Sequence, residues 1–130
     1  MALAVPDVEP AGTRLAALGF EVGAAEVVAH ENVKIRKALK TGLTVELLEP
    51  YPPATGGIAR FLARRGSGLH HVAFLCEDLA TGLKKLADCG IRTLPNYPAT
   101  GSERTRVAFL HPSDTGGLLI ELVERERFTE

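Results

Sequence analysis

Short apolar runs alternate with amphipathic segments along the chain. The runs MALAV and HHVAFLC each end before an aspartate, Asp7 or Asp78, that can cap a helix. The segments that follow, 8–19 and 79–90, carry apolar residues at helical spacing and end in glycine, which accepts a left-handed C-cap. This pattern predicts a strand followed by a helix, and it occurs twice.

Each predicted helix is followed by three β-rich stretches. They are 20–28, 32–40 and 43–49 in the first half, and 91–94, 104–110 and 117–124 in the second. Between the halves, residues 51–68 supply a turn, a short amphipathic helix over 58–65 and a Gly/Ser linker. The chain is therefore expected to be one domain of two β-α-β-β-β repeats, about 1–50 and 69–126, joined by the helical linker 51–68.

The two halves also match each other residue by residue. A shift of 71 places Ala2 on Ala73 and Asp7 on Asp78, and a shift of 75 places Glu46 on Glu121. The order of these matches makes coincidence an unsatisfactory explanation, so we interpret the chain as an internal duplication.

This duplication predicts an α+β fold in which the two units pair their sheets into a curved, half-open barrel, lined by the first and fourth strands of both units. Glu46 and Glu121 lie within otherwise apolar strands, where a carboxylate needs water, a cation or a metal to compensate its burial. His71 opens the first strand of the second unit, and imidazole with carboxylates suits a divalent first-row metal. Taken singly, each of the three is more often a solvated or packed side chain; together they form a metal-site hypothesis.

Composition narrows the possible classes of protein. The 130 residues are 45% hydrophobic and 24% charged, with 15 Lys and Arg against 16 Asp and Glu, which indicates neither disorder nor a nucleic-acid partner. No apolar run reaches the roughly 18 residues of a membrane span, and the first residues lack the features of a secretory signal, so we expect a cytoplasmic protein without a membrane partner. Cys76 and Cys89 are expected to be reduced core residues.

Four stretches carry a resemblance to a known family: LAVPDVE, VELLEP, GGIARFLARRGSGLHHVAF and VAFLHPSDTGGLLIELVE. With them the chain resembles the vicinal-oxygen-chelate superfamily of glyoxalases, bleomycin resistance proteins and extradiol dioxygenases, and within it the methylmalonyl-CoA epimerase family. The resemblance implies a homodimeric isomerase that binds cobalt(II), manganese, nickel or zinc. It further implies an acyl-CoA substrate, methylmalonyl-CoA or a related 2-carboxyacyl-CoA, whose C2 loses and regains a proton.

The resemblance also implies roles for individual residues. His71, Glu46 and Glu121 match the metal ligands of the family, and Glu121 is the candidate acid/base for one face of C2. The acid/base for the other face matches His30 without a gap in the alignment and Glu31 with one gap. The family's further histidine ligand would fall one position before Met1, where the counterpart of His71 at the 71-residue shift also falls.

Two other functions remain open on the sequence alone. A metal-free or weakly metal-binding protein of the antibiotic-binding type could use the same fold, as could a glyoxalase-type lyase or isomerase. The joint presence of Glu46, His71 and Glu121 favours the metal-dependent enzyme, because a metal-free binder has no reason to keep them buried.

Overall fold

The computed structural model describes residues 1–101 and 105–125. The chain separates into two compact units, unit 1 (Met1–His70) and unit 2 (His71–Glu130), which are described one at a time. Within the described residues, no helix is long and apolar enough to cross a membrane.

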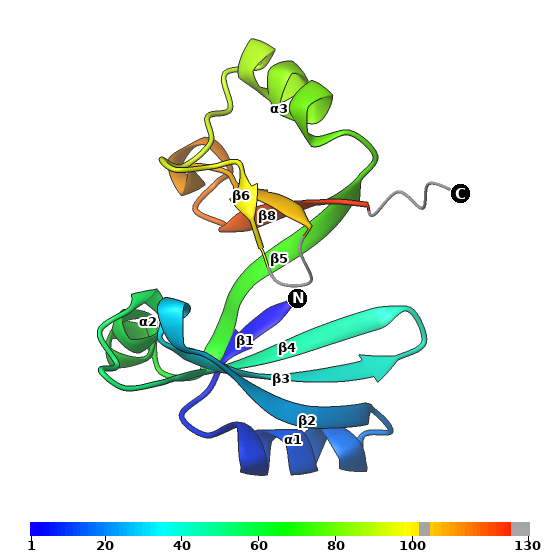
Figure 1. Ribbon diagram of the computed structural model, residues 1–130, viewed down its shortest axis with the longest axis vertical. Coiled ribbons are helices and arrows are strands. Elements are labelled where there is room, and N and C mark those ends of the chain that lie inside the picture. Colours follow the sequence, from blue (N-terminus) through cyan, green and yellow to red (C-terminus); the bar gives the residue numbers. More distant parts are fainter. Residues whose placement is uncertain (102–104, 126–130) are drawn as a thin grey trace. The chain divides into compact units, whose positions relative to one another are not determined.

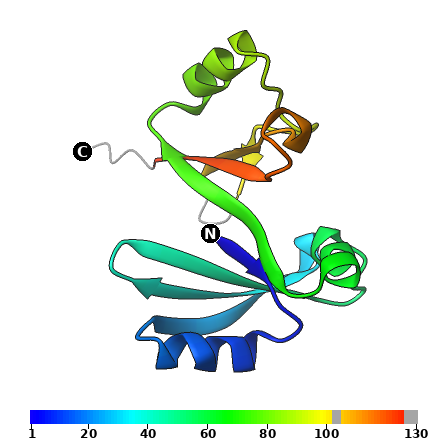
Figure 2. The ribbon, with the colours of Figure 1, turned by 180° about the vertical axis from the view of Figure 1, so that it is seen from behind.

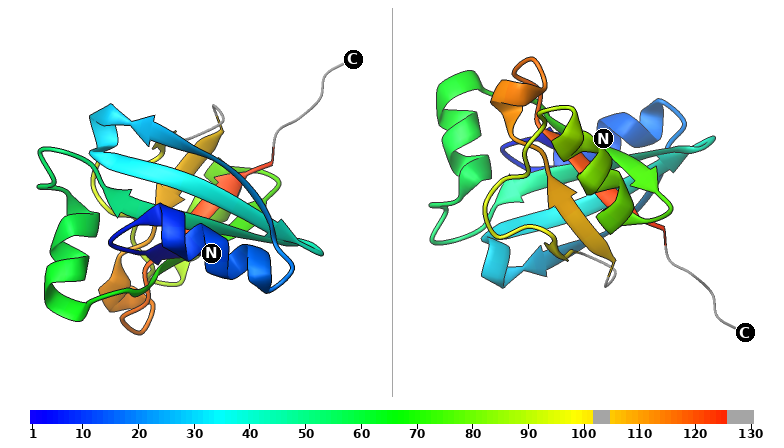
Figure 3. Two further views of the ribbon diagram at one scale, coloured as in Figure 1. Left: turned by 90° about the horizontal axis from the view of Figure 1, so that it is seen from below. Right: turned by 90° about the horizontal axis from the view of Figure 1, so that it is seen from above.

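Unit 1 is a four-stranded sheet with strand order β2-β3-β4-β1 (Figure 1). Strands β1 and β4 are parallel, while β2, β3 and β4 form an antiparallel meander. Helix α1 lies along this sheet, as Figures 1 and 3 both show. The elements of unit 1 are β1 (Ala2–Ala4), α1 (Val8–Ala17), β2 (Glu21–Val28), the 3-10 turn η1 (Ala29–Glu31), β3 (Val33–Lys40), β4 (Leu43–Pro50) and α2 (Gly57–Arg65).

Unit 2 repeats this arrangement, with strand order β5-β8-β7-β6 and a parallel β5–β8 pair (Figure 2). Strand β7 is antiparallel to both of its neighbours, β8 and β6. The elements are β5 (Gly68–Cys76), which begins at the end of unit 1, α3 (Leu79–Asp88), β6 (Ala99–Thr100), β7 (Arg106–Phe109), the 3-10 turn η3 (Pro112–Asp114) and β8 (Ile120–Glu124).

The strand registers agree with the residue correspondence between the two halves. Ala2 is the Cα partner of Glu46 in unit 1, and Ala73 is the partner of Glu121 in unit 2. These are the residues that the shifts of 71 and 75 relate. The predicted fold class, an α+β fold of two β-α-β-β-β units, is therefore confirmed.

The start of each helix is held in the same way in both units. Asp7 accepts the Glu9 amide, and Asp78 accepts the amide of Thr81, as the sequence predicted for capping residues. A second carboxylate, three residues beyond the aligned glutamate, also reaches each helix. Its contacts are Val8 N–H to Glu49 Oε1 at 2.9 Å and Leu79 N–H to Glu124 Oε2 at 2.8 Å.

The core of unit 1 occupies both faces of its sheet. Toward α1, the buried residues are Val8, Ala38, Val45 and Leu47. On the other face, the buried cluster is Ala2, Val33, Ile35 and Leu48, with Ile58 of α2 packed against it. Both faces of β4 are therefore covered at Leu47 and Leu48, which explains its nearly continuous run of apolar residues.

Two details differ from the sequence prediction. Residues 91–94 were expected to be a strand, but only the isolated bridge between Thr93 and Leu110 forms, and regular pairing with β7 begins at Ala99. Cys76 and Cys89 are free as expected, but neither belongs to the buried core. Cys76 is half-buried at the end of β5, and Cys89 is exposed because it follows α3 as its C-cap. Residue 104, the first of the predicted strand 104–110, lies outside the described residues.

Candidate functional site

Unit 2 brings His71 and Glu121 together. Side chains two residues apart on a strand share a face, so His71 lies on the same face of β5 as Ala73, whose partner on β8 is Glu121. His71 Nε2 and Glu121 Oε2 are 4.0 Å apart, and the two side chains are only 11% and 17% exposed. A largely buried imidazole beside a largely buried carboxylate makes this pair the candidate functional site of unit 2.

The pair fits a divalent metal ion. Ligand atoms at about 2.0–2.2 Å from one ion are roughly 2.8–3.6 Å apart in tetrahedral or octahedral geometry. A side-chain movement of less than about 1 Å would bring the two atoms from their present separation into that range. Across residues 1–101 and 105–125, no group of three or more His, Cys, Asp or Glu side chains lies close enough to hold an ion, so the pair by itself offers two donor groups.

Glu46, the third predicted ligand, belongs to unit 1. It is half-buried on β4 between the buried Val45 and Leu47, and its partners on the neighbouring strands are Ala2 and Lys37. Lys37 is the cross-strand neighbour on the same face, which provides a positive charge near the Glu46 carboxylate. Joint binding of an ion by Glu46 with the pair in unit 2 stays a prediction.

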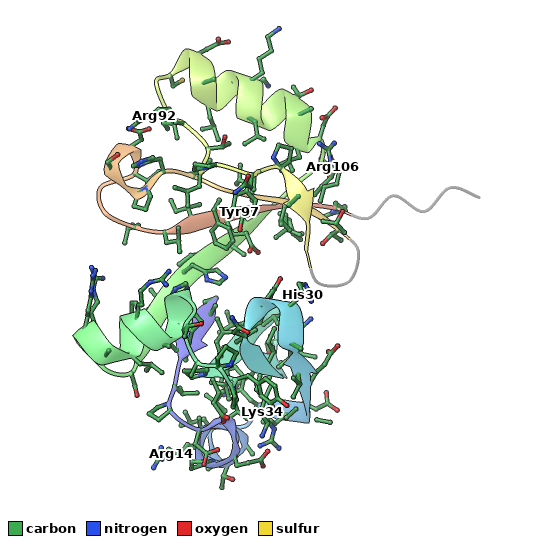
Figure 4. All side chains as sticks on the ribbon, turned by 60° about the vertical axis from the view of Figure 1, so that its left-hand side comes forward. Arg14, His30, Lys34, Arg92, Tyr97 and Arg106 are labelled. Atoms are coloured by element: carbon green, nitrogen blue, oxygen red, sulfur yellow. The ribbon has the colours of Figure 1, made fainter. Side chains whose placement is uncertain are left out.

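The two candidates for the second acid/base lie in the turn η1. His30 and Glu31 are exposed, with 82% and 51% of their side chains accessible, and His30 Nε2 is 3.8 Å from Glu31 Oε1. Figure 4 shows His30 at this turn, which ends at Asn32 in a left-handed conformation with φ of 54°. Both groups can therefore exchange protons with solvent, and the choice between them stays a prediction.

The other histidine of the HHVAF run, His70, packs against an aromatic ring of unit 1. His70 packs edge-on against Phe61 of α2, with ring centroids 5.2 Å apart. Burial lowers the pKa of His70 below its ordinary value, so this ring is neutral near pH 7. The ring contact of His70 thus lies with α2 in unit 1, whereas His71 contacts Glu121 in unit 2.

Two aromatic residues near His71 were not anticipated from the sequence. Phe109 of β7 is the cross-strand partner of Glu121, and its ring is 5.1 Å from the imidazole of His71. Tyr97, in the segment before β6, packs against Phe109 with ring centroids 5.3 Å apart (Figure 4). The register of β7 on β8 places Phe109 there, and no short-range pattern could have indicated it.

The HPSDTGG loop is held by an ion pair between Arg92 and Asp114. Arg92 Nε donates to Asp114 Oδ2 at 2.9 Å, and the Arg92 amide donates to the same oxygen at 3.0 Å. These hydrogen bonds lower the pKa of Asp114 from 3.8 to about 2. Within the same loop, Ser113 Oγ and His111 Nδ1 are 2.7 Å apart. The loop leading into β8 is thus fixed by local hydrogen bonds.

The sequence profile of the Glyoxalase/Bleomycin resistance protein/Dioxygenase superfamily matches residues 1–109 of the chain. Among relatives, the ethylmalonyl-CoA/methylmalonyl-CoA epimerase of Cereibacter sphaeroides is 34% identical over 125 residues, covering 94% of this chain and 92% of the relative. Epimerases of this kind are isomerases.

Solved structures are similar as well. The methylmalonyl-CoA epimerase of Mycobacterium tuberculosis superimposes with a TM-score of 0.86 at 29% identity, covering 97% of this chain and 85% of the other. A variant of the Streptomyces coelicolor methylmalonyl-CoA epimerase, in complex with 2-nitronate-propionyl-CoA, has a TM-score of 0.85 at 31% identity, covering 97% and 94%. These structures have the vicinal-oxygen-chelate fold expected from the sequence.

Proposed function

Because the chain belongs to the Glyoxalase/Bleomycin resistance protein/Dioxygenase superfamily, we propose that it is a metal-dependent epimerase acting at C2 of methylmalonyl-CoA or a related 2-carboxyacyl-CoA. The observation that carries the proposal is the largely buried pair of His71 and Glu121, 4.0 Å apart. The names of the relatives support this substrate class, since they include an ethylmalonyl-CoA/methylmalonyl-CoA epimerase.

In this proposal, His71, Glu121 and Glu46 hold one divalent ion, which is cobalt(II), manganese, nickel or zinc. A neutral imidazole with carboxylates is a donor set that such ions accept. When bound, the ion supplies Lewis-acid stabilisation of the negative charge that develops on substrate oxygen.

Residues of the chain then remove the C2 proton and return a proton to the opposite face. The hydrogen at C2 lies between a thioester carbonyl and a carboxylate, so breaking this C–H bond leaves its electron pair delocalised as an enolate. Glu121 accepts the proton on one face of C2, and Glu31 or His30 donates a proton on the other face, which gives the opposite epimer.

Exchange of the C2 hydrogen with deuterium from solvent tests the proposal directly, because removal of the proton precedes its return on either face. We expect the metal-loaded protein to exchange this hydrogen of methylmalonyl-CoA, and Glu121→Gln to lose exchange by about a hundredfold or more. Glu26→Gln, on an exposed position of β2, is the matched control and keeps the wild-type rate.

Replacing His30 and Glu31 separately with glutamine assigns the second acid/base. Replacing the residue that acts as the second acid/base slows epimerisation by about a hundredfold. The metal content, measured by mass spectrometry of the dialysed protein, stays at the wild-type level. If metal-loaded protein exchanges no hydrogen of any short 2-carboxyacyl-CoA, the epimerase proposal fails. We also propose that the protein is a homodimer. Light scattering of the purified protein measures its molar mass, and we expect twice the mass of one chain.

A further inference from the structure

The face of unit 2 that carries His71 and Glu121 also carries an aromatic ring. Phe109 is the direct partner of Glu121 in the antiparallel β7–β8 pair, so its side chain lies on the same face as the carboxylate. The Phe109 and His71 rings are 5.1 Å apart between centroids, at an interplanar angle of 87°. This is the edge-to-face arrangement that aromatic pairs prefer.

Phe109 is held in place by contacts with the segment before β6. The ring of Tyr97 packs against it at 5.3 Å and 71°, from the segment that connects α3 to β6 (Figure 4). The backbone of this segment is tied to β7, since the Leu94 amide donates to the Phe109 carbonyl at 2.8 Å. The three rings of Tyr97, Phe109 and His71 therefore form a continuous row of edge contacts that ends at the imidazole.

The internal duplication shows that this ring is particular to unit 2. The residue that pairs with Glu121 is Phe109, whereas the residue that pairs with the equivalent Glu46 is Lys37. The same place in the repeat thus holds a cation in unit 1 and an aromatic ring in unit 2. The ring occurs in the unit whose carboxylate has a histidine beside it.

We propose that Phe109, backed by Tyr97, is a positioning residue that holds the plane of the His71 imidazole so that Nε2 faces Glu121. The inference rests on the proposed function for the role of this pair as metal ligands. An imidazole can rotate about two side-chain bonds, and a ligand that is already oriented loses less rotational freedom when an ion binds. Phe109 offers no donor atom, so it cannot bind the ion itself and acts by packing against the ligand side chain.

The test compares Phe109→Leu with Phe74→Leu, a matched control at an exposed position of β5 whose side chain points to the opposite face. The first readout needs no metal: nitrogen-15 spectra of the imidazole report the tautomer and mobility of His71. We expect Phe109→Leu to broaden or average the His71 signals, and Phe74→Leu to leave them unchanged.

The second readout is metal affinity, measured by titration calorimetry with cobalt(II). We expect Phe109→Leu to weaken binding about tenfold, and Phe109→Tyr, which keeps the ring, to bind within about twofold of wild type. Thermal unfolding of each variant verifies that it is folded. If Phe109→Leu does not fold, Phe109→Tyr still tests the inference.

Unchanged His71 signals together with wild-type affinity in Phe109→Leu would overturn the inference. The inference also fails if Phe109→Tyr loses the His71 signals as fully as the leucine variant does. If the wild-type protein binds no cobalt(II), the metal role of the proposed function fails, while the nitrogen-15 spectra still decide whether Phe109 positions His71.

Discussion

The carboxylates that hold the two helices offer a prediction on stability. Glu49 accepts the Val8 amide at 2.9 Å, and Glu124 accepts the Leu79 amide at 2.8 Å, at equivalent places in the two repeats. We expect Glu49→Ala and Glu124→Ala each to destabilise the protein by a similar amount, because each removes the same interaction from its own unit.

The magnitude follows from the contact that is lost. A hydrogen bond to a charged group contributes about 1.5–3 kcal/mol, and a carboxylate near a helix N-terminus about 0.3–1 kcal/mol. The aspartate caps remain, so each helix keeps one accepting side chain. We therefore expect a loss of about 2 kcal/mol for either variant.

Urea unfolding followed by circular dichroism measures this loss, and Glu26→Ala, at an exposed position of β2, serves as the control within about 0.5 kcal/mol of wild type. A loss of about 2 kcal/mol corresponds to a fall of roughly 6–10 °C in Tm for a chain of this length. The reasoning is refuted if Glu49→Ala and Glu124→Ala both unfold within about 0.5 kcal/mol of wild type, or if only one of them is destabilised.

Two further predictions concern charge. Lys37→Met removes the cation opposite Glu46 and should tighten cobalt(II) binding about fivefold, because roughly 1 kcal/mol of repulsion is removed. Calorimetry measures the affinity, and unchanged binding would mean that Glu46 is not a ligand. Asp114 has its pKa lowered to about 2, so its contribution to stability is present above pH 4 and is lost as the pH falls toward 2. Asp114→Asn should therefore lose less stability than wild type between pH 4 and pH 2 in urea unfolding, and parallel pH profiles would contradict this.

Local patterns determined much of the fold. Helical spacing, the capping residues Asp7 and Asp78 and the closing glycines predicted α1 and α3, and the repeat predicted which strands correspond. These features depend on neighbouring residues of the chain, so each half could be interpreted alone. The same repeat drew attention to Glu46 and Glu121 before any contact was known.

The tertiary structure decided what these carboxylates do. Glu121 and Glu124 are three residues apart on β8, so they point to opposite faces: one lies beside His71, and the other caps α3. Their sequence context, within a single apolar strand, does not distinguish these two roles. Glu49 is in the same position relative to Glu46, and its capping role was equally absent from the sequence prediction.

The tertiary structure also decided which residues contact His71 and which conformation residues 91–94 adopt. Phe109 reaches His71 because β7 pairs with β8 in one register, and a slip of one residue would turn it to the other face. Residues 91–94 have a strand-like composition but form only one bridge, at Thr93. Register and edge pairing depend on the packing of a whole unit, with contributions from segments far apart in the chain, whereas helix and strand patterns depend on the few residues that compose them.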